Sequence, residues 1–305
     1  MNAELRPLDK ASNVELWHDH GITGKGITVW VMEDWTDHSR SCSRRVREAA
    51  PDATVIIAAP ARSLKDGEIA SYNVYAFDEN GNKGEPIPLE DFIRSRNVRV
   101  ITSSTSPDHF GKSGTVIGDY WMVIIDKYDL SVFCCSANDS KKDKDFRKNT
   151  AWKVGALVER KGKPVRAGYS NGGEGLDFIE SVGWWNGTSS ATPFLAGKAA
   201  LILQRYPDMT HERVYEYMRI NADDLGDPGE DPLYGHGWVI LPDDFKEEDV
   251  EITKTKVLVD GNVIEVKRVM VNGENYIRLR DFDDVLGICK VDYDPQRNLP
   301  IIKKG

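Results

Sequence analysis

Apolar residues in the first half of the chain gather in short runs, with helical patterns between them. The runs at Ile27–Met32, Thr54–Ala59 and Leu130–Cys135 are rich in β-branched and other apolar residues and lack polar alternation, as expected of strands buried on both faces. Val98–Thr102 is a fourth predicted strand, and it follows a helical pattern at Leu89–Arg96. This alternation predicts an α/β domain with a doubly wound parallel sheet, whose sites form at the carboxyl ends of the strands.

Two more helices complete the predicted large domain. Ser39–Ala50 reads as a helix after the first strand, and Pro193–Tyr206 as a strongly apolar one. We expect Pro193 to lie in the first turn, where a helix does not need its N–H. The charged stretch Asp243–Glu251 resembles a linker, so we divide the chain into a large domain at 1–245 and an accessory domain at 250–305.

The accessory domain is predicted to be small and β-rich. Gly and Asn accept positive φ in hairpin turns, and two such turns are expected at Asp260-Gly261-Asn262 and Val271-Asn272-Gly273. The predicted strands are Lys254–Val259, Val263–Val266 and Asn275–Leu279, with one helix at Asp281–Leu286.

Composition narrows the choice of partners. The 305 residues are 40% apolar and 29% charged, with a formal net charge of −9, which disfavours nucleic acid as a general partner. No apolar run reaches the length of a membrane span, and the N-terminus shows no signal-peptide pattern. We therefore expect a cytoplasmic protein that does not bind membranes, with export by another route left open.

The cysteines indicate buried thiols rather than a metal site. There are four, at positions 42, 134, 135 and 289, and none forms a C-x-x-C pair, so we expect neither zinc nor any other cofactor. Cys134 and Cys135 are adjacent in an apolar run, which suits thiols in a reducing compartment.

The chemistry centres on Ser189. It stands in the run Gly187-Thr188-Ser189-Ser190-Ala191-Thr192-Pro193, at the start of an apolar helix. At such a helix end a serine oxygen is exposed and backbone N–H groups can stabilise an oxyanion. Gly187 would let a substrate backbone approach closely. The structural alternative is a serine that caps the helix.

The wider run resembles the Gly-Thr-Ser-x-Ala-(Ser/Thr)-Pro signature of subtilisin-like serine peptidases, the S8 family. The likeness continues in Tyr234-Gly235-His236-Gly237 and upstream in His20-Gly21-Ile22-Thr23-Gly24. The resemblance implies the subtilisin type of parallel sheet and Ser189 as the nucleophile of a serine endopeptidase. Its substrate would be a protein or peptide, cleaved through an acyl-enzyme.

The family order of acid, histidine and serine selects His38 as the general base. Among the six histidines only His38 follows the first strand and opens a helix. The family has His-Gly-Thr-His here, whereas this chain has His38-Ser39-Arg40-Ser41. Downstream, Ala50-Pro51-Asp52-Ala53 resembles the family's Ala-Pro-x-Ala segment.

Two neighbouring carboxylates compete for the acid position, and Asp37 is a third, more distant candidate. The register of the first strand favours Glu33, but a bulge at the strand end would present Asp34 instead. Only four residues separate Glu33 from His38. The longer family segment, which carries calcium ligands, is missing, so the resemblance implies no calcium dependence and no metal site.

The resemblance supplies the remaining site residues. Ser136-Ala137-Asn138 follows a strand as the family's Ala-Gly-Asn does, which makes Asn138 the oxyanion donor. Ser104, Thr105 and Ser106 match the family's substrate-binding strand, to which an extended peptide adds by main-chain hydrogen bonds.

The accessory domain resembles the small repeat domain named after the N-terminal region of copper amine oxidases, on segments such as Tyr276-Ile277-Arg278-Leu279-Arg280. We interpret it as a binding or spacing module with a possible partner of its own.

Two hypotheses for the function of the chain stay open. One is an active serine endopeptidase, and the other is a catalytically impaired subtilisin-fold pseudo-enzyme that acts as a binding protein. The family match begins almost at the N-terminus, so no long prodomain is expected.

Overall fold

The structure is a computed structural model, and it describes residues 5–104, 110–245, 251–259, 262–271, 274–277, 289–294 and 299–304. By its internal contacts the chain divides into two compact units, Met1–Asp243 and Asp244–Gly305.

The first unit contains the seven helices of the described residues. They are α1 (Pro7–Ala11), α2 (Val14–Asp19), α3 (Asp37–Ala49), α4 (Leu89–Arg96), α5 (Val116–Tyr128), α6 (Thr188–Arg205) and α7 (His211–Ile220). Its strands begin with β1 (Thr28–Met32), β2 (Thr54–Lys65), β3 (Glu68–Ala76), β4 (Ile87–Pro88), β5 (Val98–Ser103), β6 (Ser131–Cys135) and β7 (Lys144–Asp145). They continue with β8 (Trp152–Arg160), β9 (Lys163–Arg166), β10 (Gly173–Glu174), β11 (Phe178–Ser181), β12 (Ala222–Asp223) and β13 (Trp238–Val239).

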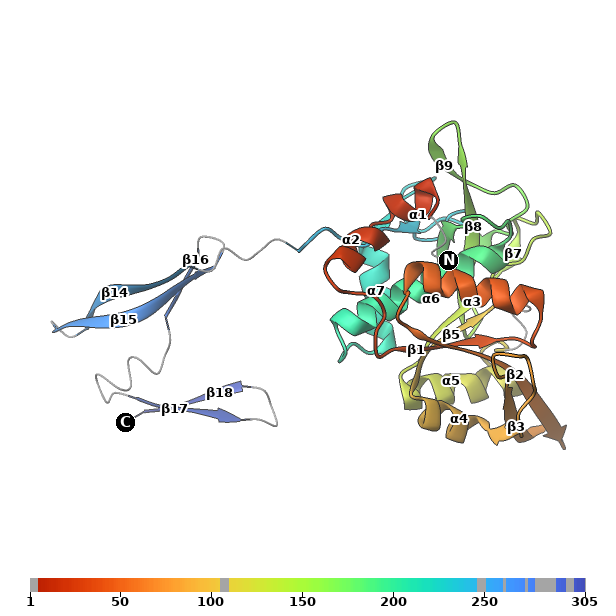
Figure 1. Cartoon of the computed structure of the whole chain (residues 1–305), viewed down its shortest axis with the longest axis horizontal. Helices are drawn as coiled ribbons and strands as arrows, with labels where there is room; N and C mark the ends of the chain where they lie inside the picture. Colours follow the sequence, from red (N-terminus) through yellow and green to blue (C-terminus); the bar gives the residue numbers. More distant parts are fainter. Residues whose placement is uncertain are drawn as a thin grey trace. The chain divides into compact units, whose positions relative to one another are not determined.

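One large sheet runs through this unit, in the order β12-β13-β11-β8-β6-β5-β1-β2-β3-β4 with β9 paired to β8. All neighbours from β13 to β2 are parallel, so the prediction of a mostly parallel α/β sheet is confirmed. Figure 1 shows helices on both faces: α3 and α6 on one, α4 and α5 on the other.

Alternation along the buried strands divides the core between these two layers. On β1, Trp30 and Met32 pack in a cluster with Phe92 of α4 and Trp121 of α5, and the Trp30 and Phe92 rings meet edge to face at 5.0 Å. Successive strand residues point to opposite faces, so Val31 lies on the α3 and α6 side. Every residue of β1 is buried, which explains its unbroken apolar run.

Helices α3 and α6 cross at unusually short range. A Cβ on Gly197 of α6 would lie 2.6 Å from the Cβ of Ala49 and 2.7 Å from the carbonyl oxygen of Val46, both on α3. Because only glycine fits there, this contact fixes the position of the two helices whose first turns carry His38 and Ser189.

Two expectations differ from the structure. Helix α6 begins at Thr188 rather than Pro193, so Pro193 is its sixth residue and not in the first turn. The N-cap is Gly187, so Thr188 and Ser189 belong to the helix. Pro193 has no N–H to donate to the Ser189 carbonyl, which accepts hydrogen bonds from Ser104 and Cys42 instead.

The second difference concerns β2, which runs past Ala59 to Lys65 and forms a hairpin with β3. The turn between them is Asp66-Gly67, and both residues have positive φ. Asp-Gly is a typical hairpin turn sequence, but the sequence analysis did not predict this hairpin.

The second unit contains β14 (Glu251–Val259), β15 (Asn262–Val271) and β16 (Glu274–Ile277), which form one antiparallel sheet. A hairpin of β17 (Cys289–Asp294) and β18 (Leu299–Lys304) accompanies them. The predicted helix at 281–286 and most residues of the two predicted turns lie outside the described residues.

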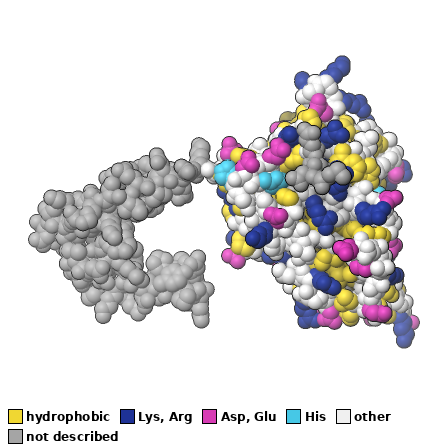
Figure 2. All heavy atoms as spheres, viewed as in Figure 1, with side chains coloured by type: hydrophobic (Ala, Val, Ile, Leu, Met, Phe, Trp, Pro, Cys, Tyr) yellow, Lys and Arg dark blue, Asp and Glu magenta, His cyan; other side chains and the backbone are white. Residues whose placement is uncertain are grey.

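The surface of the first unit carries charges of both signs. On the face shown in Figure 2, Lys and Arg side chains lie among Asp and Glu rather than in a single-sign field. Within the described part of the chain, no helix has the length and apolar character needed to cross a membrane.

Candidate active site

Strand ends and helix starts bring the predicted residues together at one edge of the sheet. Glu33 follows β1 and Ser104 follows β5, while Asn138 comes shortly after β6. His38 is the second residue of α3, and Ser189 is the second residue of α6. Ser189 is therefore not a helix cap, because the N-cap is Gly187.

Glu33 and His38 form a short hydrogen bond. His38 Nδ1 lies 2.6 Å from Glu33 Oε2, with the carboxylate side chain 2% exposed and the imidazole 36% exposed. The hydrogen bond and the charge of Glu33 raise the pKa of His38 above 6.5, against the opposing effect of burial. With Nδ1 carrying the proton toward Glu33, Nε2 is free to accept one. Asp34, the competing acid, is exposed.

Ser104 links this pair to Ser189. Its backbone N–H donates to Glu33 Oε1 at 3.2 Å, and its carbonyl accepts from the Ser189 hydroxyl at 3.0 Å. The Ser189 hydroxyl thus makes its hydrogen bond to Ser104; among the described residues it makes none to His38. Catalytic hydrogen bonds are often absent or long before substrate binds.

The carbonyl of Ser189 would normally accept from residue 193, but Pro193 has no N–H. Two side chains donate to it instead: the Ser104 hydroxyl at 3.2 Å and the Cys42 thiol at 3.5 Å. These contacts explain how α6 tolerates Pro193, and they fix the backbone of Ser189 against α3 and the end of β5.

Asn138 contacts the same helix start. Its Oδ1 accepts from the backbone N–H and the hydroxyl of Thr188, at 2.9 and 3.1 Å, so its Nδ2 stays available as a donor. The Ser189 N–H lies in the first turn, where the helix offers it no carbonyl. A Cβ on Gly187, whose φ is +122°, would stand 3.8 Å from both Asn138 Nδ2 and Ser189 N. Asn138 Oδ1 lies 3.9 Å from the same point. The amide of Asn138 and the N–H of Ser189 therefore both border the space beside Gly187.

A cleft of about 600 Å³ opens beside these residues and is lined by Glu33, Asp34, Thr36, His38, Ala59, Pro60 and Ser104. Of the predicted substrate-binding residues, Ser104 is buried at this cleft and Gly187 adjoins Asn138. Thr105 and Ser106 lie outside the described residues.

Sequence reasoning missed two neighbours of His38. Cys42 lies one turn later on α3, with its sulfur 3.8 Å from His38 Nδ1 and 3.5 Å from Glu33 Oε1. The i, i+4 spacing from His38 was the signal for it. Trp185 meets the His38 ring edge to face at 5.0 Å, a contact between distant segments that no local pattern indicates.

The fold is similar to that of subtilisin-like serine peptidases. Residues 174–237 match the sequence model described as the subtilase family, a segment that contains Ser189. An extracellular serine protease of Serratia marcescens is 29% identical over 187 residues, which cover 61% of this chain and 16% of that protein. The chain thus spans about a sixth of the length of this curated relative.

Two solved structures share the fold. A lanthipeptide protease is 18% identical with a TM-score of 0.53, over 76% of this chain and 91% of that one. The MycP3 protease from the type VII (ESX-3) secretion system is 15% identical with a TM-score of 0.54, over 78% of this chain and 87% of that one. Their likeness supports the subtilisin type of α/β sheet.

Proposed function

We propose that this chain is a serine endopeptidase in which Ser189 is the nucleophile, His38 the general base and Glu33 the acid that orients it. The observation that carries the proposal is the 2.6 Å hydrogen bond from His38 to the buried Glu33, joined to Ser189 through Ser104. A serine hydroxyl is a weak nucleophile unless a base takes its proton.

In the proposed reaction each of these groups has one role. Rotation of the Ser189 side chain from the Ser104 carbonyl toward His38 Nε2 starts the reaction. His38 takes the hydroxyl proton as the oxygen attacks the peptide carbonyl, and later gives the proton to the leaving amine. Glu33 stabilises the imidazolium that forms. Asn138 Nδ2 and the Ser189 N–H stabilise the oxyanion, an interaction worth on the order of 10²–10³ in turnover for each donor. Water then releases the acyl group.

Substrate binding is proposed for the cleft next to Ser104. An extended peptide would pair with the chain after β5, where Ser104, Thr105 and Ser106 stand, and its carbonyl would lie beside Gly187. The second unit is proposed to bind or space a partner, and the similarity to the copper amine oxidase N-terminal-like domain remains a prediction. The cytoplasmic location also remains a prediction.

One observation favours the alternative of a catalytically impaired binding protein. The Ser189 hydroxyl donates to the Ser104 carbonyl rather than to His38. If that hydrogen bond persisted with substrate, the nucleophile would stay unactivated.

A fluorophosphonate probe separates the two functions, because it labels only an activated serine. We expect wild-type protein to be labelled and to hydrolyse a casein substrate, and Ser189→Ala to do neither. Ser190→Ala is the matched control, since the Ser190 hydroxyl donates to the Val182 carbonyl away from His38; it should keep labelling. A folded wild-type protein that never reacts would favour the binding protein, and equal labelling of Ser189→Ala would overturn the assignment of the nucleophile.

A further inference from the structure

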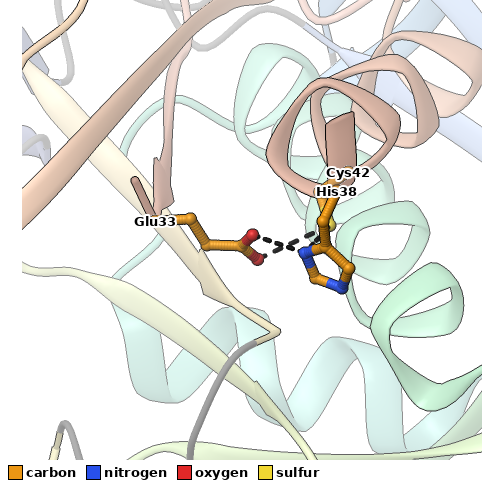
Figure 3. A group of neighbouring side chains, drawn as sticks. All are labelled: Glu33, His38 and Cys42. Atoms are coloured by element: carbon orange, nitrogen blue, oxygen red, sulfur yellow. Dashed lines mark hydrogen bonds and ion pairs between the residues drawn. The ribbon is translucent and has the colours of Figure 1, made fainter. Parts of the chain in front are cut away.

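Three potential metal ligands converge beside the proposed base. Figure 3 shows the side chains of Glu33, His38 and Cys42 pointing toward one another, the last two from the same helix. Their ligand atoms all lie within 4.8 Å of one another. The separations are 2.6 Å between His38 Nδ1 and Glu33 Oε2, 3.5 Å between Cys42 Sγ and Glu33 Oε1, and 3.8 Å between Cys42 Sγ and His38 Nδ1.

These distances suit a tetrahedral ion. Zinc bonds of about 2.0–2.3 Å place neighbouring tetrahedral ligands about 3.3–3.6 Å apart. The two separations that involve the sulfur already fall close to this range. The 2.6 Å separation runs to Glu33 Oε2 and the 3.5 Å separation to Glu33 Oε1. To supply a single ligand oxygen, the Glu33 carboxylate must therefore turn, and that oxygen must lie about 0.7 Å farther from His38 Nδ1 than Oε2 does now. The His38 imidazole is 36% exposed and lines the cleft, so its solvent side leaves room for this adjustment, while the Trp185 ring packs against it at 5.0 Å.

The donor set selects the metal. A thiolate and an imidazole favour borderline-soft ions, whereas Ca²⁺ and Mg²⁺ prefer shells of oxygen. Three protein ligands leave the fourth position to water or another small ligand from the cleft. We propose that Glu33, His38 and Cys42 form a binding site for Zn²⁺ that switches off the proposed peptidase.

Zinc would inhibit the proposed peptidase by changing which nitrogen of His38 carries a proton. Zinc replaces the proton of the Cys42 thiol, which passes to solvent, and occupies His38 Nδ1. The neutral imidazole then carries its proton on Nε2, the atom that must accept the Ser189 proton. Coordination of zinc by Glu33 also breaks the hydrogen bond between Glu33 and His38 Nδ1. This consequence rests on the proposed function, whereas binding of the ion does not.

Binding is tested in the full-length Ser189→Ala protein, which keeps the three ligands. We expect Co²⁺ to give a thiolate-to-cobalt charge-transfer band, and one equivalent of Zn²⁺ to abolish it by displacement. The other cluster of possible ligands among the described residues is Asp126, His211 and Glu212, which has no sulfur and cannot produce this band.

Cys42→Ala and Cys134→Ala are matched variants, because both thiols are free and fully buried. Cys42→Ala should lose the band and weaken Zn²⁺ binding at least about tenfold, equivalent to about 1.4 kcal/mol; Cys134→Ala should retain both. Circular dichroism confirms that each variant is folded. A missing band in Ser189→Ala, or equal Zn²⁺ affinity in the two cysteine variants, would overturn the proposal.

Activity supplies an independent readout. Zn²⁺ should inhibit the wild type reversibly, with recovery on adding EDTA. The concentration for half inhibition should rise at least about tenfold in Cys42→Ala, each variant being compared with its own metal-free rate. Peptidase activity without the cobalt band would leave the function standing and refute the zinc site. The band without any activity would support the site and refute the function.

Discussion

At the scale of single residues, the Glu33–His38 hydrogen bond controls the pH at which the proposed base works. It raises the pKa of His38 above 6.5, so the imidazolium persists to higher pH than in a free histidine. Since only neutral imidazole accepts the Ser189 proton, kcat/KM should fall as the pH drops through this raised pKa. A pH profile of peptide hydrolysis should therefore show its acid limb above pH 6.5.

Glu33→Gln tests the cause of this limb. Without the carboxylate charge the His38 pKa falls, so the limb moves to lower pH. In addition, kcat drops on the order of 10⁴-fold, because the Gln amide can donate to Nδ1 and hold the imidazole proton on Nε2, the atom that must accept the Ser189 proton. Asp34→Asn is the control for a neighbouring charge, because Asp34 is exposed. If Asp34→Asn moves the limb and Glu33→Gln does not, the acid has been assigned to the wrong residue.

At the scale of elements, Gly197 determines how closely α3 and α6 approach. Alanine usually stabilises a helix relative to glycine, by about 1 kcal/mol, but here its Cβ would meet Ala49 Cβ at 2.6 Å. We expect Gly197→Ala to lower the free energy of unfolding by about 1–3 kcal/mol and to reduce kcat, because His38 and Ser189 lie in the first turns of these two helices. Urea unfolding measures the first and peptide hydrolysis the second.

Ala49→Gly supplies the compensating change. It removes the atom nearest to the new Cβ, so the double variant should recover part of the loss, although the Val46 carbonyl at 2.7 Å still opposes it. Gly197→Ala alone being more stable than the wild type would mean that helix propensity outweighs the contact.

The same strands and helices show which parts of the fold and of the candidate site can be predicted from the sequence. Strands β1 and β6 and the first half of β2 follow from apolar runs, and β5 from its place after a helical pattern. Helix α3 is predicted from Ser39, two residues after its actual start at Asp37. The early start of α6 is not predictable locally, because it depends on Ser104 and Cys42 satisfying the carbonyl that Pro193 leaves free. Sequence likewise does not choose between Glu33 and Asp34, because the preference for Glu33 rests on its burial and its hydrogen bond to His38; the role of Glu33 as the acid remains a proposal. The proximity of Cys42 to His38 could have been predicted, because residues four apart lie on the same face of a helix.

At the scale of the whole first unit, one buried arginine joins parts that are distant in sequence. Both Arg45 and Asp9 are fully buried, and the Arg45 guanidinium binds the Asp9 carboxylate through two hydrogen bonds, at 3.0 and 3.1 Å. It also donates to the carbonyls of Ser181 at the end of β11 and of Ser190 on α6. The start of the chain, the His38 helix and the backbone next to Ser189 are thus connected through a single side chain.

Removing Asp9 should therefore destabilise the unit and disturb the site together. Breaking a buried ion pair from one side costs about 3–5 kcal/mol, because the remaining charge is left without its partner; the loss for Asp9→Ala should fall toward the lower end, since Glu48 also accepts from Arg45 at 2.7 Å. Glu216→Ala breaks the exposed pair with Arg219 on α7 and should cost less than about 1 kcal/mol. Urea unfolding of the two variants compares the costs. The kcat should fall only in Asp9→Ala, because Arg45 donates to the Ser190 carbonyl next to Ser189, whereas Arg219 pairs with Glu216 on α7. Equal costs for the two pairs would mean that Arg45 finds full compensation in Glu48 and the two carbonyls.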